Sequence, residues 1–318
     1  MANVLVTTRM SDSALSILKD AGHDLFICDA PGWEEKRDMA QKFGCEAVAC
    51  RGGAFPKEFF ESLPALRILA LPSAGYDGVD LQTAEKNGTV VTNAGDGNAK
   101  SVAELAFMLM LAAAKHLKTN MQIAASGNAW RAKKQQTFTE VSDKTVALLG
   151  YGNIARELGL MCRAFSMRVI AYHPHIEQKA LPESFVPCND LLTAIKDADF
   201  VSSHIPARPE NVHFLSDDAF AAMKPGAIFV NTGRGSVADT DALVRALESG
   251  HLAGAGLDVF EEEPLPADSP LLSLENVICT PHVGGETIEA KRRVYEIAAK
   301  NVARVLAGEA PLSPVFAK

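Results

Sequence analysis

The stretch "VALLGYGNIARELG", residues 146–159, decides the fold of this chain. Apolar residues lead into a turn that carries Gly150 and Gly152, and a helical pattern containing Ala155 follows. In a GxGxxA turn the first glycine permits a tight bend, the second lets a pyrophosphate approach the backbone, and the third small residue lets helix and strand pack closely. Glycines at a sharp turn can be purely structural. Here a strand pattern precedes the turn and a helix follows it, so the stretch predicts a dinucleotide site at the helix start.

Apolar runs of strand length alternate with helical patterns along nearly the whole chain. Before the glycine turn these runs are "NVLVTT", "DLFIC", "EAVAC", "LRILAL" and "TVVTNAG", and after it they are "RVIAYH", "DFVSSHIP", "AIFVNTG", "GAGLDV" and "NVICTPH". Such strands, separated by helices, form parallel sheets covered on both faces. Because 318 residues are many for one core, we expect two domains. Residues 98–287 form the dinucleotide-binding domain, and residues 1–97 plus 288–318 form the second.

Composition limits the class of protein. Apolar residues make up 47% of the chain and charged residues 22%, which is typical of a folded globular protein. The 31 basic and 39 acidic residues give a net charge of −8, which argues against a nucleic-acid partner but not against a small anionic substrate. We see no leader pattern and no apolar run of membrane length, so we expect no membrane association and a cytoplasmic location. The six cysteines form no CxxC pair, and we expect no disulfides.

One helical stretch is unusually apolar. "SVAELAFMLMLAAAKH", residues 101–116, is expected to begin with a capping box between Ser101 and Glu104. It is too hydrophobic for a surface helix, which predicts a buried helix at a domain or subunit interface. Together with the polar segment around Trp130, it predicts a homodimer.

Three residues with chemical potential follow the ends of later strands. Arg234 lies in "NTGRGS", Glu263 in "FEEEP" and His282 in "TPHVGG". The carboxyl ends of parallel strands meet at one edge of a sheet, where ligands bind. A carboxylate beside an imidazole orients the ring and favours its protonated form, and an arginine between glycines can present its fork to a carboxylate. Each residue alone is usually structural, but the set after a dinucleotide turn predicts a catalytic site.

These motifs resemble the D-isomer-specific 2-hydroxyacid dehydrogenase family. The resemblance covers nearly the whole chain and rests on "SAGYDGVD", "NAGDGNAKSVAELA", "LLGYGNIAREL", "HIPARPEN", "MKPGAIFVNTGRGSVADTDALVRALESGHLAGAGLDVFEEEPLP" and "NVICTPHVGG". It implies an α/β fold of two doubly wound parallel-sheet domains, with a Rossmann coenzyme domain inserted into a flavodoxin-like substrate domain. Within the family, it suggests a glyoxylate or hydroxypyruvate reductase, or a phosphoglycerate dehydrogenase-like enzyme without a regulatory domain.

The resemblance also implies a reaction, the reduction of a 2-oxo acid to a D-2-hydroxy acid by a nicotinamide cofactor. Arg234 would bind the substrate's carboxylate and carbonyl, His282 would donate the proton, and Glu263 would partner His282. The implied cofactor residues are Gly150, Gly152, Asn153, Ile154, His173, Pro206, Thr232, Asp258 and Gly284. For Asp258, a role beside the histidine, or a purely structural turn cap, is open as well.

The substrate loops are expected in "CRGGAF" and "SAGYD". By resemblance, backbone amides of Gly52, Gly53, Ala74 and Gly75 would bind the substrate carboxylate together with Arg234. Arg51 could reach a distal phosphate, carboxylate or hydroxymethyl group, or could form an ordinary surface salt bridge.

The choice between NAD and NADP depends on the stretch "RVIAYHPHIEQK", residues 168–179. A fold that prefers NAD usually ends its second strand in an acid, but His173 stands there and no acid follows until Glu177. No arginine follows to bind a 2′-phosphate, although Lys179 and a protonated His173 or His175 could help. We therefore expect NAD, with NADP as a serious alternative. The two histidines lack a third ligand, so no metal site is expected.

Two other functions are compatible with the motifs. Some proteins that resemble this fold are cofactor-sensing transcriptional corepressors, and these can retain the same three residues. A formate-dehydrogenase-like reaction is disfavoured, because that relative has glutamine where Glu263 stands.

Overall fold

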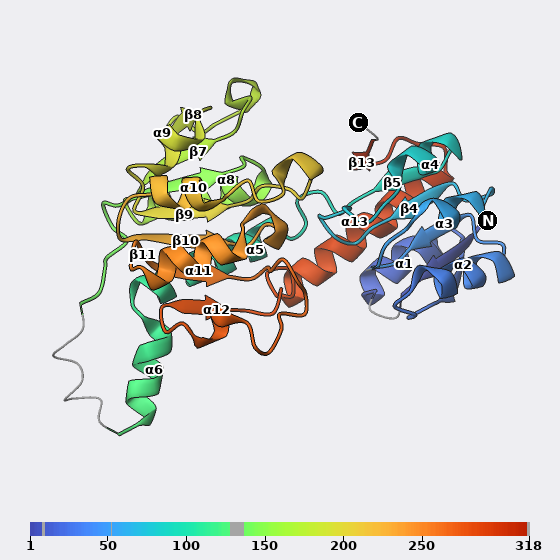
Figure 1. The fold of residues 1–318 in the computed structure, drawn as a ribbon. Helices are drawn as coiled ribbons and strands as arrows, with labels where there is room; N and C mark the ends of the chain where they lie inside the picture. The colour runs from blue at the N-terminus through green and yellow to red at the C-terminus, as the bar shows by residue number, and fades with distance from the viewer. Residues whose placement is uncertain (8–9, 52, 128–136, 317–318) are drawn as a thin grey trace. The chain divides into compact units, whose positions relative to one another are not determined.

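The computed structural model describes residues 1–7, 10–51, 53–127 and 137–316. Residues Met1–Asn98 and Glu286–Lys318 form one compact unit, here called the terminal unit, and residues Ala99–Gly285 form the central unit. The boundaries expected from sequence lie within two residues of these. Each unit is an α/β layered structure with its own sheet (Figure 1).

The terminal unit contains a six-stranded sheet in the order β13-β5-β4-β3-β1-β2. All neighbours are parallel except β13, which pairs antiparallel with β5. The strands are β1 (Asn3–Val6), β2 (Asp24–Ile27), β3 (Ala47–Ala49), β4 (Ile68–Ala70), β5 (Val90–Thr92) and β13 (Pro314–Val315). The parallel strands follow the flavodoxin-like order 2-1-3-4-5.

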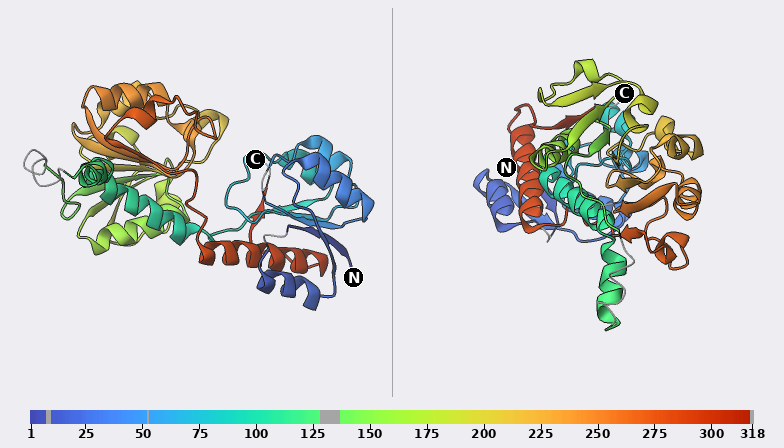
Figure 2. Two further views of the ribbon diagram at one scale, coloured as in Figure 1. Left: turned by 90° about the horizontal axis from the view of Figure 1, so that it is seen from below. Right: turned by 90° about the vertical axis from the view of Figure 1, so that its left-hand side faces the viewer.

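Helices cover both faces of this sheet (Figure 2). They are α1 (Asp12–Asp20), α2 (Trp33–Lys42), α3 (Lys57–Glu61), α4 (Leu81–Lys86) and α13 (Ile288–Leu306). The long helix α13 packs beside α1 and against β3 and β4. Its inward residues, among them Val294, Tyr295 and Val302, are buried with apolar residues of the strands. The C-terminal helix therefore completes the core that the first residues begin.

The central unit contains a seven-stranded parallel sheet in the order β12-β11-β10-β9-β6-β7-β8. The strands are β6 (Thr145–Leu149), β7 (Arg168–Tyr172), β8 (Phe185–Cys188), β9 (Phe200–Ser203), β10 (Ala227–Asn231), β11 (Leu252–Leu257) and β12 (Val277–Cys279). Six of them follow the Rossmann order 3-2-1-4-5-6, and β12 extends the sheet. The strand orders confirm the expected pair of doubly wound domains.

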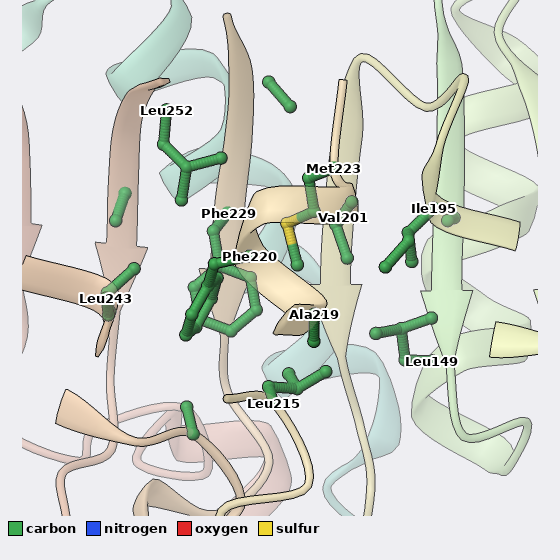
Figure 3. Packing of buried hydrophobic residues seen from close by; sticks show 14 of the residues in the cluster. Leu149, Ile195, Val201, Leu215, Ala219, Phe220, Met223, Phe229, Leu243 and Leu252 are labelled. Atoms are coloured by element: carbon green, nitrogen blue, oxygen red, sulfur yellow. The ribbon is translucent and has the colours of Figure 1, made fainter. Parts of the chain in front are cut away.

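Apart from α6, which extends away from the sheet, the helices of the central unit form two layers. They are α5 (Ala99–Ala114), α6 (Leu117–Ala125), α8 (Asn153–Ala164), α9 (Leu191–Ile195), α10 (Asp217–Ala222), α11 (Thr240–Glu248) and α12 (Pro270–Ser273), with 3-10 turns η2 (Ile176–Gln178), η3 (Pro209–Asn211) and η4 (Gly235–Val237). Figure 3 shows the core beneath α10, where the rings of Phe220 and Phe229 meet edge to face at 5.3 Å between centroids. This packing fixes the strands whose ends carry the candidate site.

Helix α5 differs from the sequence expectation in two respects. It begins at Ala99, so Ser101 is not its cap, and the predicted capping box is wrong. The Ser101 hydroxyl instead donates to the carbonyl of Gly284 at 2.5 Å. Most of α5 is buried against α8, β10 and β11, so its apolar character is explained within its own unit.

Strand β8 was not expected from the sequence. It is only four residues long, contains Pro187, and has two exposed positions. Proline is tolerated at the edge of a sheet, where no ladder hydrogen bond is lost, and β8 is an edge strand.

No helix in the described part of the chain is long and apolar enough to cross a membrane. All six cysteines are free thiols.

Candidate active site

The glycine turn after β6 lies where the strand order reverses, between β6 and β9. Gly150 has φ 87°, and a Cβ there would lie 2.9 Å from the carbonyl oxygen of His204. Only glycine fits, because the backbone is left-handed and the chain leaving β9 packs against it. The turn therefore borders the crevice where open α/β sheets bind ligands.

Helix α8 starts at this turn without a side-chain cap. Its N-cap is Gly152, where an added Cβ would meet no atom within 4 Å. The first amides of the helix, including those of Asn153 and Ile154, have no intrahelical partner and carry the positive end of the helix dipole. Ala155 is fully buried and lets the helix pack on the sheet. Open space next to uncapped amides fits a pyrophosphate.

Arg234 follows β10 in a turn that neighbouring loops compress. A Cβ at Gly233 would lie 3.2 Å from the backbone of His204, and a Cβ at Gly235 would lie 1.9 Å from the carbonyl carbon of Phe260. The two glycines therefore make room for the chains leaving β9 and β11. The absence of side chains on both sides of Arg234 therefore follows from loop packing. It would also leave room for a ligand.

The side chain of Asn231 fixes the same turn. Its Oδ1 accepts from the amide of Gly233 and its Nδ2 donates to the carbonyl of Arg234, both at 3.0 Å. The guanidinium of Arg234 donates to the carbonyl of Gly233 at 2.7 Å. The position of Arg234 is thus set by short-range contacts at the end of a buried strand.

His282 and Glu263 form a hydrogen-bonded pair. His282 Nδ1 donates to Glu263 Oε2 at 2.7 Å, and Glu263 Oε1 accepts from the amide of Phe260 at 3.0 Å. Both side chains are partly exposed, at 53% and 37%. Because the carboxylate holds Nδ1 as a donor, the opposite ring nitrogen is the one placed to exchange a proton. Within the described residues, nothing bonds that nitrogen.

Asp258 holds the loop that carries His282. Its carboxylate is 1% exposed and accepts from Thr280 Oγ1 at 2.6 Å and from the amides of Val283 and Gly284, both at 2.9 Å. The carbonyl of Gly284 in turn accepts from Ser101 on α5. These three donors are the contacts of a structural turn cap, and the cofactor and histidine-side roles of Asp258 stay predictions. Ser101 carried no sequence signal for this role, because its partner is 183 residues away.

Comparison with known proteins identifies the family. The family model for the D-isomer specific 2-hydroxyacid dehydrogenase NAD binding domain matches residues 107–284, more than half of the chain. The chain belongs to the D-isomer-specific 2-hydroxyacid dehydrogenase family. It is a D-2-hydroxyacid dehydrogenase that uses a nicotinamide cofactor.

Three relatives show how far the similarity extends. Glyoxylate reductase from Pyrococcus furiosus is 33% identical over 97% of this chain and 93% of its own. Hydroxypyruvate reductase from Thermotoga maritima is 41% identical over 74% of this chain and 76% of its own. The solved NADPH-dependent glyoxylate/hydroxypyruvate reductase from Sinorhizobium meliloti, in complex with citrate, is 26% identical, with a TM-score of 0.84 and coverage of 100% of both chains.

The edge where this dehydrogenase would hold its cofactor has unmet hydrogen-bonding capacity. In the described part of the chain, Ser203 Oγ, His204 Nδ1 and Thr232 Oγ1 are buried without a partner. Ser203 ends β9 and His204 follows it, next to Gly150, while Thr232 follows the neighbouring strand β10. Burial lowers the pKa of His204 to about 4, so its ring is neutral. Buried polar groups are normally paired, so these atoms fit a polar ligand in the crevice. Sequence reasoning anticipated Thr232 but missed the other two.

His173 ends β7, where an NAD-preferring fold usually has an acid. Its Nδ1 accepts from the amide of His175 at 3.0 Å. Burial, with the nearby charges of Lys179, His175 and Arg208, lowers the pKa of His173 although Glu177 opposes the shift. Arg208 was missed by sequence reasoning, because it comes from the loop after β9 and not from the stretch after β7. In that loop, Pro206 is exposed, and its carbonyl accepts from Asn211 at 2.9 Å.

A pocket of about 590 Å³ adjoins the proposed acid–base pair. It is mostly apolar and is lined by Phe260, Glu263, Pro264, Leu265, Leu272, Cys279, Thr280, Pro281 and His282. The pair thus stands at the boundary between solvent and an apolar wall. Among the described residues, no group of three or more histidines, cysteines or acids could hold a metal.

Glu261 lies on the same loop as Glu263 and holds that loop to other parts of the central unit. It forms a hydrogen bond with His213 Nε2, and its Oε2 accepts from the amide of Thr240 at 2.9 Å. Burial tends to raise the pKa of Glu261, but hydrogen bonds from Thr240 and His213 outweigh this and lower it. The hydrogen bond to Glu261 raises the pKa of His213, with Asp239 at 3.7 Å adding to the effect. Glu261 therefore ties the loop that carries Glu263 to the start of α11.

Gly53, Ala74 and Gly75 lie in the terminal unit, in the segments that follow β3 and β4. Gly53 has φ 83°, and a Cβ there would lie 3.0 Å from the carbonyl oxygen of Pro31. The carbonyl of Ala74 accepts from Asn93 Nδ2, and that of Gly75 accepts from the Ser73 hydroxyl, both at 2.9 Å. These bonds use the carbonyls of Ala74 and Gly75 and not their amides.

Three further expectations concern Arg51, Gly52 and Trp130. Arg51 forms an ion pair with Glu286 at 2.5 Å, so the salt-bridge alternative is present. Gly52 and Trp130 lie outside the described residues.

Proposed function

We propose that this dehydrogenase reduces small 2-oxo acids to D-2-hydroxy acids with NAD(P)H. The observation that carries the proposal is the 2.7 Å hydrogen bond between His282 and Glu263, because it orients an exposed imidazole beside a carboxylate. Arg234 follows the adjacent strand β10, and its neighbour Gly235 packs on the loop that leads to Glu263. A proton donor and an anion-binding arginine on neighbouring loops suit a substrate with a carbonyl next to a carboxylate.

In the proposed reaction, a bound reduced nicotinamide supplies the hydride. His282 donates a proton to the carbonyl oxygen as negative charge develops there. Glu263 holds the ring through Nδ1, so the opposite nitrogen is the one that donates. Arg234 binds the substrate carboxylate through its two-pronged fork and polarises the carbonyl, which fixes the orientation of the reacting carbon.

Glyoxylate and hydroxypyruvate are the substrates that the relatives' names support most directly. In the proposal, the amides of Gly52, Gly53, Ala74 and Gly75 bind the substrate carboxylate. The experiment is to follow loss of NADH or NADPH absorbance with glyoxylate, hydroxypyruvate, pyruvate and bulkier 2-oxo acids, and to determine the configuration of the product. The proposal is wrong if none of these acids oxidises either cofactor, or if the product is the L-hydroxy acid.

For the cofactor, we propose NAD(H), with NADP(H) also accepted. The α8 amides, with Gly150 and Gly152, would hold the pyrophosphate of either. His173 stands where an acid would repel a 2′-phosphate. The positive charges of Lys179 and Arg208 lie close enough to His173 to lower its pKa. The relative from Sinorhizobium meliloti is NADPH-dependent, which supports acceptance of the phosphate.

Replacing His173 with aspartate tests this assignment. The new carboxylate would accept from the ribose hydroxyls and repel a phosphate, so the ratio of kcat/KM for NADPH to that for NADH should fall by at least about tenfold. Because the pKa of His173 is lowered, its own charge should add to NADPH preference only well below about pH 6.5. The control is the replacement of the exposed His175 with aspartate, measured in the same way. An unchanged ratio in His173→Asp would show that selectivity is set elsewhere.

We also propose a homodimer, although α5 no longer supports it. The supporting feature is α6, which has no buried residue in the chain alone and exposes Leu117 and Met121. Figure 2 shows α6 extending away from the layers of the central unit. Light scattering that reports a single 34.0 kDa chain at micromolar concentration would contradict the dimer.

A further inference from the structure

Arg51 is held by an acid from a distant part of the chain. Its guanidinium lies 2.5 Å from Glu286 Oε1, although the two residues come from opposite ends of the terminal unit's sequence. Arg51 lies two residues after the end of β3. Glu286 directly precedes Thr287, the N-cap of α13. The pair therefore lies at the start of the loop that would receive the substrate.

A second cation holds the other oxygen of the same carboxylate. Lys291 Nζ lies 2.7 Å from Glu286 Oε2. Burial tends to raise the pKa of Glu286, but hydrogen bonds from Lys291 and Arg51 outweigh this and lower it. Glu286 is thus an anion at neutral pH, and the three side chains together carry one net positive charge.

The pair is also within reach of solvent. The side chains of Arg51 and Glu286 are 33% and 32% exposed. A ligand group that arrives at this loop meets a carboxylate beside the arginine and not a free guanidinium. A neutral or short group loses nothing there, whereas a second anionic group finds the arginine already paired and must displace Glu286 to bind it.

We propose that Glu286 acts as an internal anion that occupies Arg51 and makes the enzyme select against 2-oxo acids that carry a second negative charge. This inference rests on the proposed function, in which the loop after β3 faces the substrate. Specificity of this kind depends on a repulsive element as much as on an attractive one. Without Glu286, Arg51 and Lys291 together would favour a distal carboxylate or phosphate.

The test compares two four-carbon substrates that differ only at the far end. Oxaloacetate has a carboxylate where 2-oxobutyrate has a methyl group. In the wild-type enzyme, kcat/KM should be higher for 2-oxobutyrate. In Glu286→Gln, the ratio of kcat/KM for oxaloacetate to that for 2-oxobutyrate should rise by about tenfold, and added salt should reduce the gain because the contact is partly exposed.

Two further variants assign the effect to Arg51. Glu286→Gln combined with Arg51→Ala should return the ratio toward the wild-type value. Glu309→Gln, which breaks the surface ion pair of Glu309 with Arg304 in the same unit, should leave the ratio unchanged. Glu286→Asp keeps the charge but cannot span both cations, and it should give an intermediate ratio even if the glutamine variant folds poorly.

Failure of this inference differs from failure of the proposed function. If 2-oxo acids are reduced but Glu286→Gln changes the ratio by less than about twofold, Glu286 is not the selecting group. If the gain persists without Arg51, the arginine is not the group that Glu286 masks, and the proposal is overturned. If no 2-oxo acid is reduced by the wild-type enzyme, the proposed function itself is wrong.

Discussion

Two glutamates on the loop after β11 each pair with a histidine from a different loop of the central unit, and the two pairs differ in what surrounds them. His282 binds Glu263 and His213 binds Glu261, two residues earlier in the chain. Both histidines have φ 51°, and each glutamate also accepts a backbone amide, from Phe260 or from Thr240. The local chemistry of the two pairs is therefore nearly the same.

The surroundings separate the pairs. His282 lines the apolar pocket, whereas His213, within the described residues, lies outside it among acidic neighbours at the start of α11. The hydrogen bond to Glu261, with the nearby acids, raises the pKa of His213 and favours its charged form, which suits an anchor. Among the described residues, His282 has one acid in hydrogen-bond contact and no partner at its second nitrogen, which suits proton transfer. Position relative to a pocket, and not the pair itself, distinguishes a catalytic candidate from a structural one.

The largest effect is expected from His282→Gln. It should lower kcat for 2-oxo acid reduction by about 100- to 10,000-fold, the usual contribution of a positioned proton donor. The matched control is His213→Gln, which should lower kcat by less than about tenfold, because it only loosens the loop. Similar kcat values for the two variants would abolish the distinction between the pairs.

A smaller effect is expected from Gly235→Ala, which acts on the loop shared by both pairs. The added Cβ would lie 1.9 Å from the Phe260 carbonyl carbon, so the segment carrying Glu261 and Glu263 must shift. We expect a loss of about 1–3 kcal/mol in the free energy of unfolding, together with a lower kcat. Denaturant unfolding and steady-state kinetics measure the two quantities. A variant with wild-type values in both would show that the loop position is not critical.

The smallest effect is a pH dependence of stability from His213. Its pKa is raised in the folded protein, so its contribution is complete below about pH 6.5 and is lost as the pH rises through the folded value. Because the pair is partly exposed, the contribution should be under about 1 kcal/mol. Denaturant unfolding of wild type and His213→Gln should therefore differ most at about pH 6 and converge at about pH 9. A difference that grows with pH would contradict the anchor role.

The sequence predicted features that depend on neighbours along the chain. The strand alternation, the glycine turn at Gly150 and Gly152, and the positions of Arg234, Glu263 and His282 are all readable locally, because each follows an apolar run. The fold class was confirmed for the same reason. The roles of the three residues remain predictions until variants are measured.

Contacts between distant segments could not be predicted. Nothing in the sequence near Arg51 indicates Glu286, 235 residues later. Arg208 approaches His173 only because β9 and β7 flank the same strand β6. The capping box at Ser101 failed because a tertiary acceptor, the Gly284 carbonyl, takes the hydroxyl. A local motif gives a residue's place in the chain, but its partners are set by the order of strands in the sheet.

The bond between Ser101 and Gly284 has a consequence for how such a chain can arise. These residues lie near the first and last positions of the central unit, so its two ends meet within a single hydrogen bond. A domain whose termini are adjacent can be inserted into a loop of another domain without opening either core. The coenzyme domain is therefore a separate structural unit. The same geometry predicts that residues 99–285, expressed alone, retain their fold.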